Sequence, residues 1–142
     1  MKKYEILEHT TDLKIRAFGK TKEELFLNML KGMFESVKPK ILTTPSPSLK
    51  RRGIRTRKIN IKSADEQSLL VDFLSEALTL SDINNEAYFE VEFEKLTETE
   101  LEAEIFGAPV KSFSTEIKAV TYHGLEIKKT DGGWEATVLF DI

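Results

Sequence analysis

The stretch EIKAVTYHGLEIKKTDGGWEATVLFDI, residues 116–142, predicts how the chain folds at its carboxyl end. Two segments with strand character, Glu116 to Lys128 and Trp134 to Asp141, flank the sequence TDGG. Its glycines permit the positive φ angles of a tight turn. We therefore expect an antiparallel hairpin at the end of the chain.

The turn of this hairpin fixes which residues of the two strands face each other. Two dipeptides within residues 131–133 could form it, DG or GG. A DG turn pairs Tyr122 with Asp141, whereas a GG turn pairs Gly124 with Asp141. Both registers predict that the sequence YHG, residues 122–124, faces the last two residues of the chain.

The amino-terminal part predicts two strands followed by a helix. Residues 2–8 and 13–18 show strand patterns. Thr21 and Glu24 form a capping-box sequence, so we expect the helix to begin there and to end before Pro39. The apolar residues that recur on one face of this helix, which we interpret as core, are Leu25, Phe26, Met29, Leu30, Met33, Phe34 and Val37.

The middle of the chain, residues 39–58, loses this periodicity and gathers six basic residues at positions 50–58. We expect a variable basic loop or a ragged edge strand here, which resolves into a short strand around Ile59 and Ile61. The basic side chains either contact phosphates or are simply solvated. The stretch lacks the interleaved aromatic residues that stack on bases.

A second helix follows this basic stretch. Ser63 and Glu66 form another capping-box sequence, and the apolar residues after them recur with helical spacing to about Leu80. Because both helices have one broad apolar face, we expect both to pack against the same sheet system.

The next segment predicts a hairpin with one acidic face. Residues 87–94 and 100–105 alternate between apolar and mostly acidic side chains, which places Phe89 on the apolar face and Tyr88 on the acidic one. Together these patterns predict one α+β domain, residues 1–142, in which two amphipathic helices pack on largely antiparallel β-sheet.

Composition narrows the classes of function. The 142 residues include no cysteine, which excludes disulfides and thiolate sites and leaves oxygen and imidazole as metal ligands. A net charge of −3 argues against wholesale coating of nucleic acid. No apolar run is long enough to span a bilayer, and the charged amino terminus lacks the apolar core of a signal peptide. We expect a soluble, cytoplasmic protein.

Carboxylates near the end of the chain form the first candidate site. Asp141 supplies a side-chain carboxylate and Ile142 a terminal one, so a hard cation such as Ca²⁺ or Mg²⁺ would stabilise this end. Asp12 is a third candidate ligand if the first and last strands lie close together. The alternative is structural, with Asp12 capping a turn and Asp141 solvated.

The two histidines, His9 and His123, fit either a functional site or an ordinary structural role. The sequence contains no Walker loop, GxGxxG motif, nucleophile elbow or HExxH motif. We therefore do not expect a self-contained enzyme. A metal-dependent hydrolase built from the histidines with Asp12 and Asp141 is the alternative within the enzyme class.

Four segments resemble the archease family, small partner proteins of the RtcB-type tRNA-splicing RNA ligase. They are EHTTDLKIRAFGKTKEELF at 8–26, LLVDFLSEALTL at 69–80, EIKAVTYHGLEI at 116–127 and GWEATVLFDI at 133–142. TYHGL combined with a final FDI is the specific part of the match. Relatives commonly have HTAD where this chain has HTTD, and many have a histidine near the position of Ser112.

The resemblance implies a non-enzymatic activator that promotes guanylylation of the ligase, supports its multiple turnover and can broaden its NTP use. It also implies a site for a divalent metal ion whose ligands are Asp12, Asp141 and an oxygen of Ile142. The expected ion is Ca²⁺, with Mg²⁺ or Mn²⁺ as alternatives. The candidates for contacting the partner or supporting these ligands are His9, Lys118, Tyr122 and His123. RNA contact is expected only through the ligase or the basic loop, and an RNA-binding or chaperone-like adaptor is the alternative function.

Overall fold

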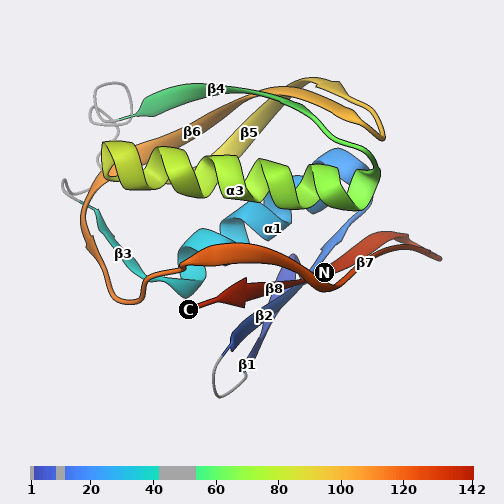
Figure 1. Ribbon diagram of the computed structural model, residues 1–142, viewed down its shortest axis with the longest axis horizontal. Helices are drawn as coiled ribbons and strands as arrows, with labels where there is room; N and C mark the ends of the chain where they lie inside the picture. The colour runs from blue at the N-terminus through green and yellow to red at the C-terminus, as the bar shows by residue number, and fades with distance from the viewer. Residues whose placement is uncertain (1, 9–11, 42–53) are drawn as a thin grey trace.

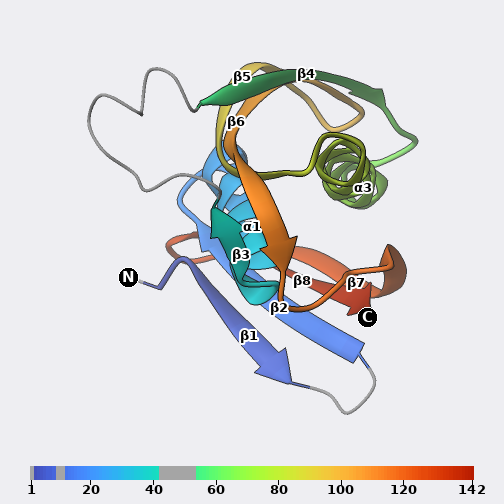
Figure 2. The same cartoon turned by 90° about the vertical axis from the view of Figure 1, so that its left-hand side faces the viewer.

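In the part of the chain that the computed structural model describes, residues 2–8, 12–41 and 54–142, two helices lie between two β-sheets (Figures 1 and 2). All pairings among these strands are antiparallel, which confirms the predicted single-domain α+β fold. The elements in chain order are β1 (Tyr4–Glu8), β2 (Asp12–Gly19), α1 (Lys22–Ser36), β3 (Pro39–Ile41), β4 (Arg55–Lys62), α3 (Glu66–Asn84), β5 (Glu86–Leu96), β6 (Glu100–Phe113), β7 (Ala119–Thr130) and β8 (Gly133–Asp141).

The first sheet has the strand order β1-β2-β8-β7, so strands from the two ends of the chain lie side by side (Figure 2). In β2, Ile15 and Ala17 are fully buried on the side of α1. Lys14 and Arg16 alternate with them and point to the opposite face, as strand geometry requires. The strand predicted at residues 13–18 is therefore confirmed.

The second sheet covers the other side of the helices. Its long strand β6 pairs with β4 and β5 and, at its far end, with β3. Between the layers the rings of Phe26 on α1, Phe73 on α3 and Phe93 on β5 contact one another, with centroids 5.8, 6.4 and 6.2 Å apart. Each helix contacts strands of both sheets, which explains why its apolar stripe is broad.

The two helices begin with side-chain caps, but only one cap is the predicted residue. The Thr21 hydroxyl accepts a hydrogen bond from the Glu24 amide at 3.1 Å, as expected for α1. At α3 the cap is Asp65, which accepts from the Ser68 amide at 2.8 Å, so the prediction of Ser63 as the cap is wrong. Neither of these described helices is long and apolar enough to cross a membrane.

The final hairpin turns at Asp131 and Gly132, the first of the two predicted turns, because Thr130 pairs with Gly133. The same register continues into the middle of β7 and β8. The predicted hairpin is therefore confirmed, and the first of its two predicted registers holds for this half.

A bulge in β7 then changes the register. Between Thr121 and Glu126, β7 contains more residues than the facing part of β8, and Gly124 within this bulge has φ +66°. Asp141 consequently faces Ala119 and no residue of YHG. The prediction that YHG faces the last two residues is wrong, because a bulge inserts residues that a strict alternation does not reveal.

A second irregularity, in β5, exchanges the faces of Tyr88 and Phe89. Tyr88 is fully buried and Phe89 is 45% exposed, the reverse of the predicted alternation, and the register shifts at this point. The Tyr88 hydroxyl donates to the Glu86 carboxylate at 2.6 Å. Arg57 donates to both oxygens of the same carboxylate, at 3.0 and 2.8 Å, so Glu86 is buried but fully partnered.

The predicted basic loop is partly strand. It begins with β3 at Pro39, and β4 begins at Arg55, ahead of the short strand predicted around Ile59. Because Arg57 is bound to Glu86, part of the basic stretch stabilises the second sheet. Positions 42–53 lie outside the described residues.

Candidate functional site

Asp12 and Asp141 lie directly opposite each other where the pairing of β2 with β8 ends. Further along this pairing Ile15 faces Val138, and both are fully buried on the helix side. Because side chains alternate between faces, this buried pair places the two aspartates together on the outer face. The core pattern of the two strands thus fixes the position of the carboxylates.

The two carboxylates are accessible and have no counter-ion among the residues that the structure describes. Asp12 is half-buried and Asp141 is exposed. Directly opposite residues have Cβ atoms about 4.5–5.5 Å apart, and like charges at such positions repel. Neither side chain forms an ion pair or hydrogen bond with any residue in the described ranges, including Lys14, which lies two residues from Asp12 on the same face.

The groups at this strand end fit a hard cation. Asp12 and Asp141 offer carboxylate oxygens, and Ile142 offers main-chain oxygen next to them, the ligand types that Ca²⁺ and Mg²⁺ prefer. In the described ranges no three His, Asp or Glu side chains gather closely enough to hold a metal ion. Within the described residues, the two aspartates therefore need main-chain, water or partner oxygens to complete a coordination shell.

Lys118 is the predicted partner-contacting residue that lies beside this pair. Its backbone N–H donates to the Asp141 carbonyl oxygen at 2.7 Å, and the next residue, Ala119, faces Asp141. The structure thus brings the start of β7 to the carboxylate pair.

Tyr122 and His123 lie further along β7, on the bulge. His123 is four residues beyond Ala119, about 13 Å along an extended strand. The Tyr122 hydroxyl donates to Asp72 on α3 at 2.7 Å. This hydrogen bond is the main cause of the raised pKa of Tyr122, and burial is a smaller cause. The bulge is therefore attached to α3 and does not form one cluster with Asp141. His9 lies outside the described residues.

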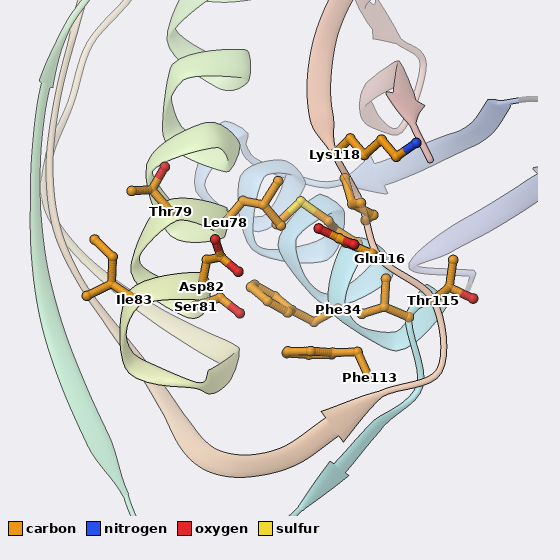
Figure 3. A pocket seen from close by; sticks show the side chains of 13 residues that line it. Phe34, Leu78, Thr79, Ser81, Asp82, Ile83, Phe113, Thr115, Glu116 and Lys118 are labelled. Carbon is orange, nitrogen blue, oxygen red and sulfur yellow. The ribbon is translucent and has the colours of Figure 1, made fainter.

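A cavity of about 430 Å³ opens next to the same strand end, between the last turns of α1 and α3 and the segment 113–118 (Figure 3). Phe34 contributes to its apolar floor, Asp82 and Glu116 contribute carboxylates, and Lys118 lies at its edge. Sequence reasoning missed this cavity because α3 extends past its predicted end, so Asp82 was not recognised as part of a helix.

Sequence comparison relates the chain to known proteins over nearly its whole length. Residues 4–142 match the Archease protein family (MTH1598/TM1083). The chain is similar to the protein archease of Methanosarcina mazei, at 41% identity over 99% of this chain and 97% of the relative. It is also similar to the protein archease of Pyrococcus abyssi, at 32% identity over the full length of both.

Solved structures show the same fold. The solution structure of protein 1598 from Methanobacterium thermoautotrophicum superposes with a TM-score of 0.73, at 27% identity over all of both chains. The crystal structure of an archease from Thermotoga maritima, described as a possible chaperone, superposes with a TM-score of 0.65. The two sequences are 19% identical, and the superposition covers 96% of this chain and 94% of the Thermotoga chain, so this structure supports the fold alone.

Proposed function

Because the chain belongs to the archease family, we propose that it is a non-catalytic activator of an RtcB-type tRNA-splicing RNA ligase in the cytoplasm. The family match supports this proposal, and the opposed carboxylates of Asp12 and Asp141 carry it. An accessible pair of carboxylates without a counter-ion among the described residues is suited to interact with cations at the surface of another protein. In this scheme the ligase makes the bonds, and the activator contributes charge and position.

The chain's own residues would act through their placement at one strand end. Asp12 and Asp141 present two carboxylates on the outer face of the sheet, and Ile142 adds main-chain oxygen. A divalent ion held there, Ca²⁺ first and Mg²⁺ or Mn²⁺ as alternatives, would supply positive charge near the nucleotide phosphates of the ligase. Docking of the carboxylates at the ligase's nucleotide site would thereby favour its guanylylation and repeated turnover.

The remaining candidate residues fall into three groups. Lys118 would contact the partner together with the carboxylate pair, because it lies at the same strand end. Tyr122 and His123 would make a separate contact from the bulge. His9 is proposed from the family resemblance alone.

Ligase guanylylation and RNA-joining turnover test this function. The reactions contain substoichiometric cognate ligase with no addition, the wild-type chain, Asp12→Asn or Asp141→Asn. We expect the wild type to restore multiple turnover and each variant to lose most of this effect. Glu126→Gln is the matched control, because it removes one exposed carboxylate from β7 in the same sheet without touching the pair.

Full activation by both aspartate variants would show that the pair does not carry the function. If the wild type leaves the ligase rate unchanged, the activator proposal is wrong. Salt-dependent RNA binding by the chain alone would then favour the adaptor function, and RNA cleavage by the purified chain with Mn²⁺ would favour a hydrolase.

A further inference from the structure

The cavity between the ends of α1 and α3 has the size and floor of a binding pocket. Its volume of about 430 Å³ falls within the range of roughly 300–1,000 Å³ typical of ligand pockets. Ile83 on its rim is 70% exposed and extends the apolar surface outward. The apolar floor consists of Met33, Phe34, Val37, Leu78, Phe113 and Ile117.

The charged groups of this cavity are mainly acidic. Asp82 enters from α3 and Glu116 from the segment before β7, and Figure 3 shows their carboxylates on facing walls of the cavity. Neither side chain has an ion-pair or hydrogen-bond partner among the residues that the structure describes. Two accessible carboxylates therefore flank an apolar floor, and no described residue neutralises them.

The end of α3 adds to this negative potential. Asp82 lies in the last turn of the helix, which contains no basic residue. The carboxyl end of a helix carries a partial negative charge, so a carboxylate there is unfavourable unless a cation binds nearby. Lys118 does not serve this purpose, because its side chain points away from the two carboxylates (Figure 3).

Arginine matches these features better than any other cationic side chain. Its planar guanidinium presents donors along two edges and can bridge two carboxylates. Its flat faces also stack on aromatic rings such as that of Phe113, which is partly exposed in the floor. A lysine ammonium is a compact, strongly hydrated charge and would use the apolar floor less well.

We propose that this cavity binds an arginine side chain of a partner protein, whose neighbouring apolar residue packs on Ile83. The site goes beyond the proposed function of the Asp12 and Asp141 pair and does not require it. The two sites nevertheless share one end of the molecule, because Lys118 lines the cavity and donates its N–H to Asp141. A partner held by its arginine at the cavity would be oriented toward the carboxylate pair.

The test uses two capped dipeptides, acetyl-Leu-Arg-amide and acetyl-Leu-citrulline-amide, which differ in the charge of one side chain. Each is titrated into the full-length ¹⁵N-labelled protein while amide chemical shifts are followed. We expect the arginine peptide to shift the amides of Thr79, Asp82, Thr115 and Glu116, and binding to weaken as salt is added. The citrulline peptide should bind at least about tenfold more weakly, since it cannot form charge-assisted hydrogen bonds.

The double variant Asp82→Asn with Glu116→Gln should bind the arginine peptide more weakly than the wild type by about the same factor. Its binding of the citrulline peptide should be unchanged. Glu76→Gln is the matched control, because it removes an exposed carboxylate from the same helix outside the cavity, and it should bind like the wild type. Circular dichroism confirms that the variants fold. Equal binding of the two peptides, shifts that map elsewhere, or no binding of the arginine peptide would overturn the proposal.

Discussion

At the scale of single residues, the opposition of Asp12 and Asp141 predicts that stability depends on cations. Without a divalent ion, Asp141→Asn should raise the free energy of unfolding by about 0.5 kcal/mol, because it removes a directly opposed like charge. With Ca²⁺ at 100 times its dissociation constant, the free energy of unfolding of the wild type should rise by about 2.7 kcal/mol, whereas that of the variant should hardly change. The order of stability then reverses, which thermal unfolding in EDTA and in Ca²⁺ would reveal.

The control for this reversal is Glu126→Gln, which should follow the wild type in both buffers because Glu126 faces Thr137 and not a carboxylate. A wild type that is insensitive to Ca²⁺ while Asp141→Asn is still stabilised in EDTA would confirm the repulsion and contradict the metal site. A variant that gains as much from Ca²⁺ as the wild type would show that Asp141 is not a ligand.

A different carboxylate, Glu86, should stabilise the fold through its buried partners. Glu86 is 2% exposed and is bound by Arg57 and Tyr88. Glu86→Gln removes the charge that faces Arg57, and we expect a loss of roughly 2–4 kcal/mol in urea unfolding, somewhat less than for a fully buried pair because Arg57 is one-third exposed. Glu94→Gln, at an exposed position of the same strand, should be nearly neutral.

The effect of Glu86→Gln should also depend on pH. Burial raises the pKa of Glu86, but the hydrogen bonds from Arg57 and Tyr88 outweigh it and hold the pKa below its ordinary value. The unfolded chain therefore takes up this proton first as the pH falls, so the stabilisation is complete above the ordinary carboxyl pKa and is lost in stronger acid. The stability difference between wild type and variant should shrink below about pH 4, and a difference that grows there would contradict this assignment.

Sequence reasoning proposed Asp12 and Asp141 as site residues but did not recognise Glu86 as a buried ion-pair partner. The two aspartates stand out because they lie at the ends of strands whose buried residues can be read from the alternation. Glu86 lies just after a helix whose end was predicted too early, and its partner Arg57 belongs to a stretch that was interpreted as a basic loop. Ion pairs between distant segments depend on topology, which local patterns do not contain.

At the scale of elements, the same limit explains which parts of the hairpins were predicted. Period-two alternation gave the strands and TDGG gave the turn, because both are local properties. The bulges in β5 and β7 were not predicted, since an extra residue changes the pairing without leaving a unique sequence signal. The prediction that Ser63 caps α3 was wrong for a similar reason. The Ser63 hydroxyl donates to the Asp72 carboxylate at 2.6 Å instead of capping the helix.

Three glycines of the final hairpin should respond differently to alanine. Gly133 has φ +149°, and a Cβ there would lie 2.2 Å from the Gly19 carbonyl oxygen, so Gly133→Ala should cost about 3 kcal/mol. Gly124 has φ +66° but open space around it, so Gly124→Ala should cost about 1 kcal/mol. Gly132 has neither constraint, and Gly132→Ala should lie within about 0.5 kcal/mol of the wild type.

Urea unfolding of the three variants ranks these effects. Asparagine provides a second check, because it tolerates the left-handed conformation better than alanine and should recover part of the loss at position 124. At position 133 asparagine should recover nothing, since its Cβ meets the same carbonyl oxygen. An equal cost of alanine at 124 and 133 would mean that the close approach to Gly19 is not what restricts Gly133.

At the scale of the whole molecule, the sequence indicated two helices on antiparallel sheet but not how the layers stack. Both apolar stripes were recognised, yet a stripe does not tell whether one sheet or two cover it. The structure resolves this by pairing β2 with β8 across the full chain and by placing the second sheet on the far side of the helices (Figures 1 and 2). One buried cluster therefore joins residues of both sheets and both helices.

This single core predicts that the layers unfold together. Phe73 contacts Phe26 and Phe93 between the helices and the second sheet, whereas Trp134, the only tryptophan, reports on the first sheet. Phe73→Ala should cost about 3–5 kcal/mol and lower the urea midpoint equally by tryptophan fluorescence and far-UV circular dichroism. Phe89→Ala removes the same side chain at a position that is 45% exposed and should change either midpoint little. If Phe73→Ala shifted the circular-dichroism midpoint and left the Trp134 fluorescence midpoint unchanged, the first sheet would unfold as an independent unit, contrary to the continuous core.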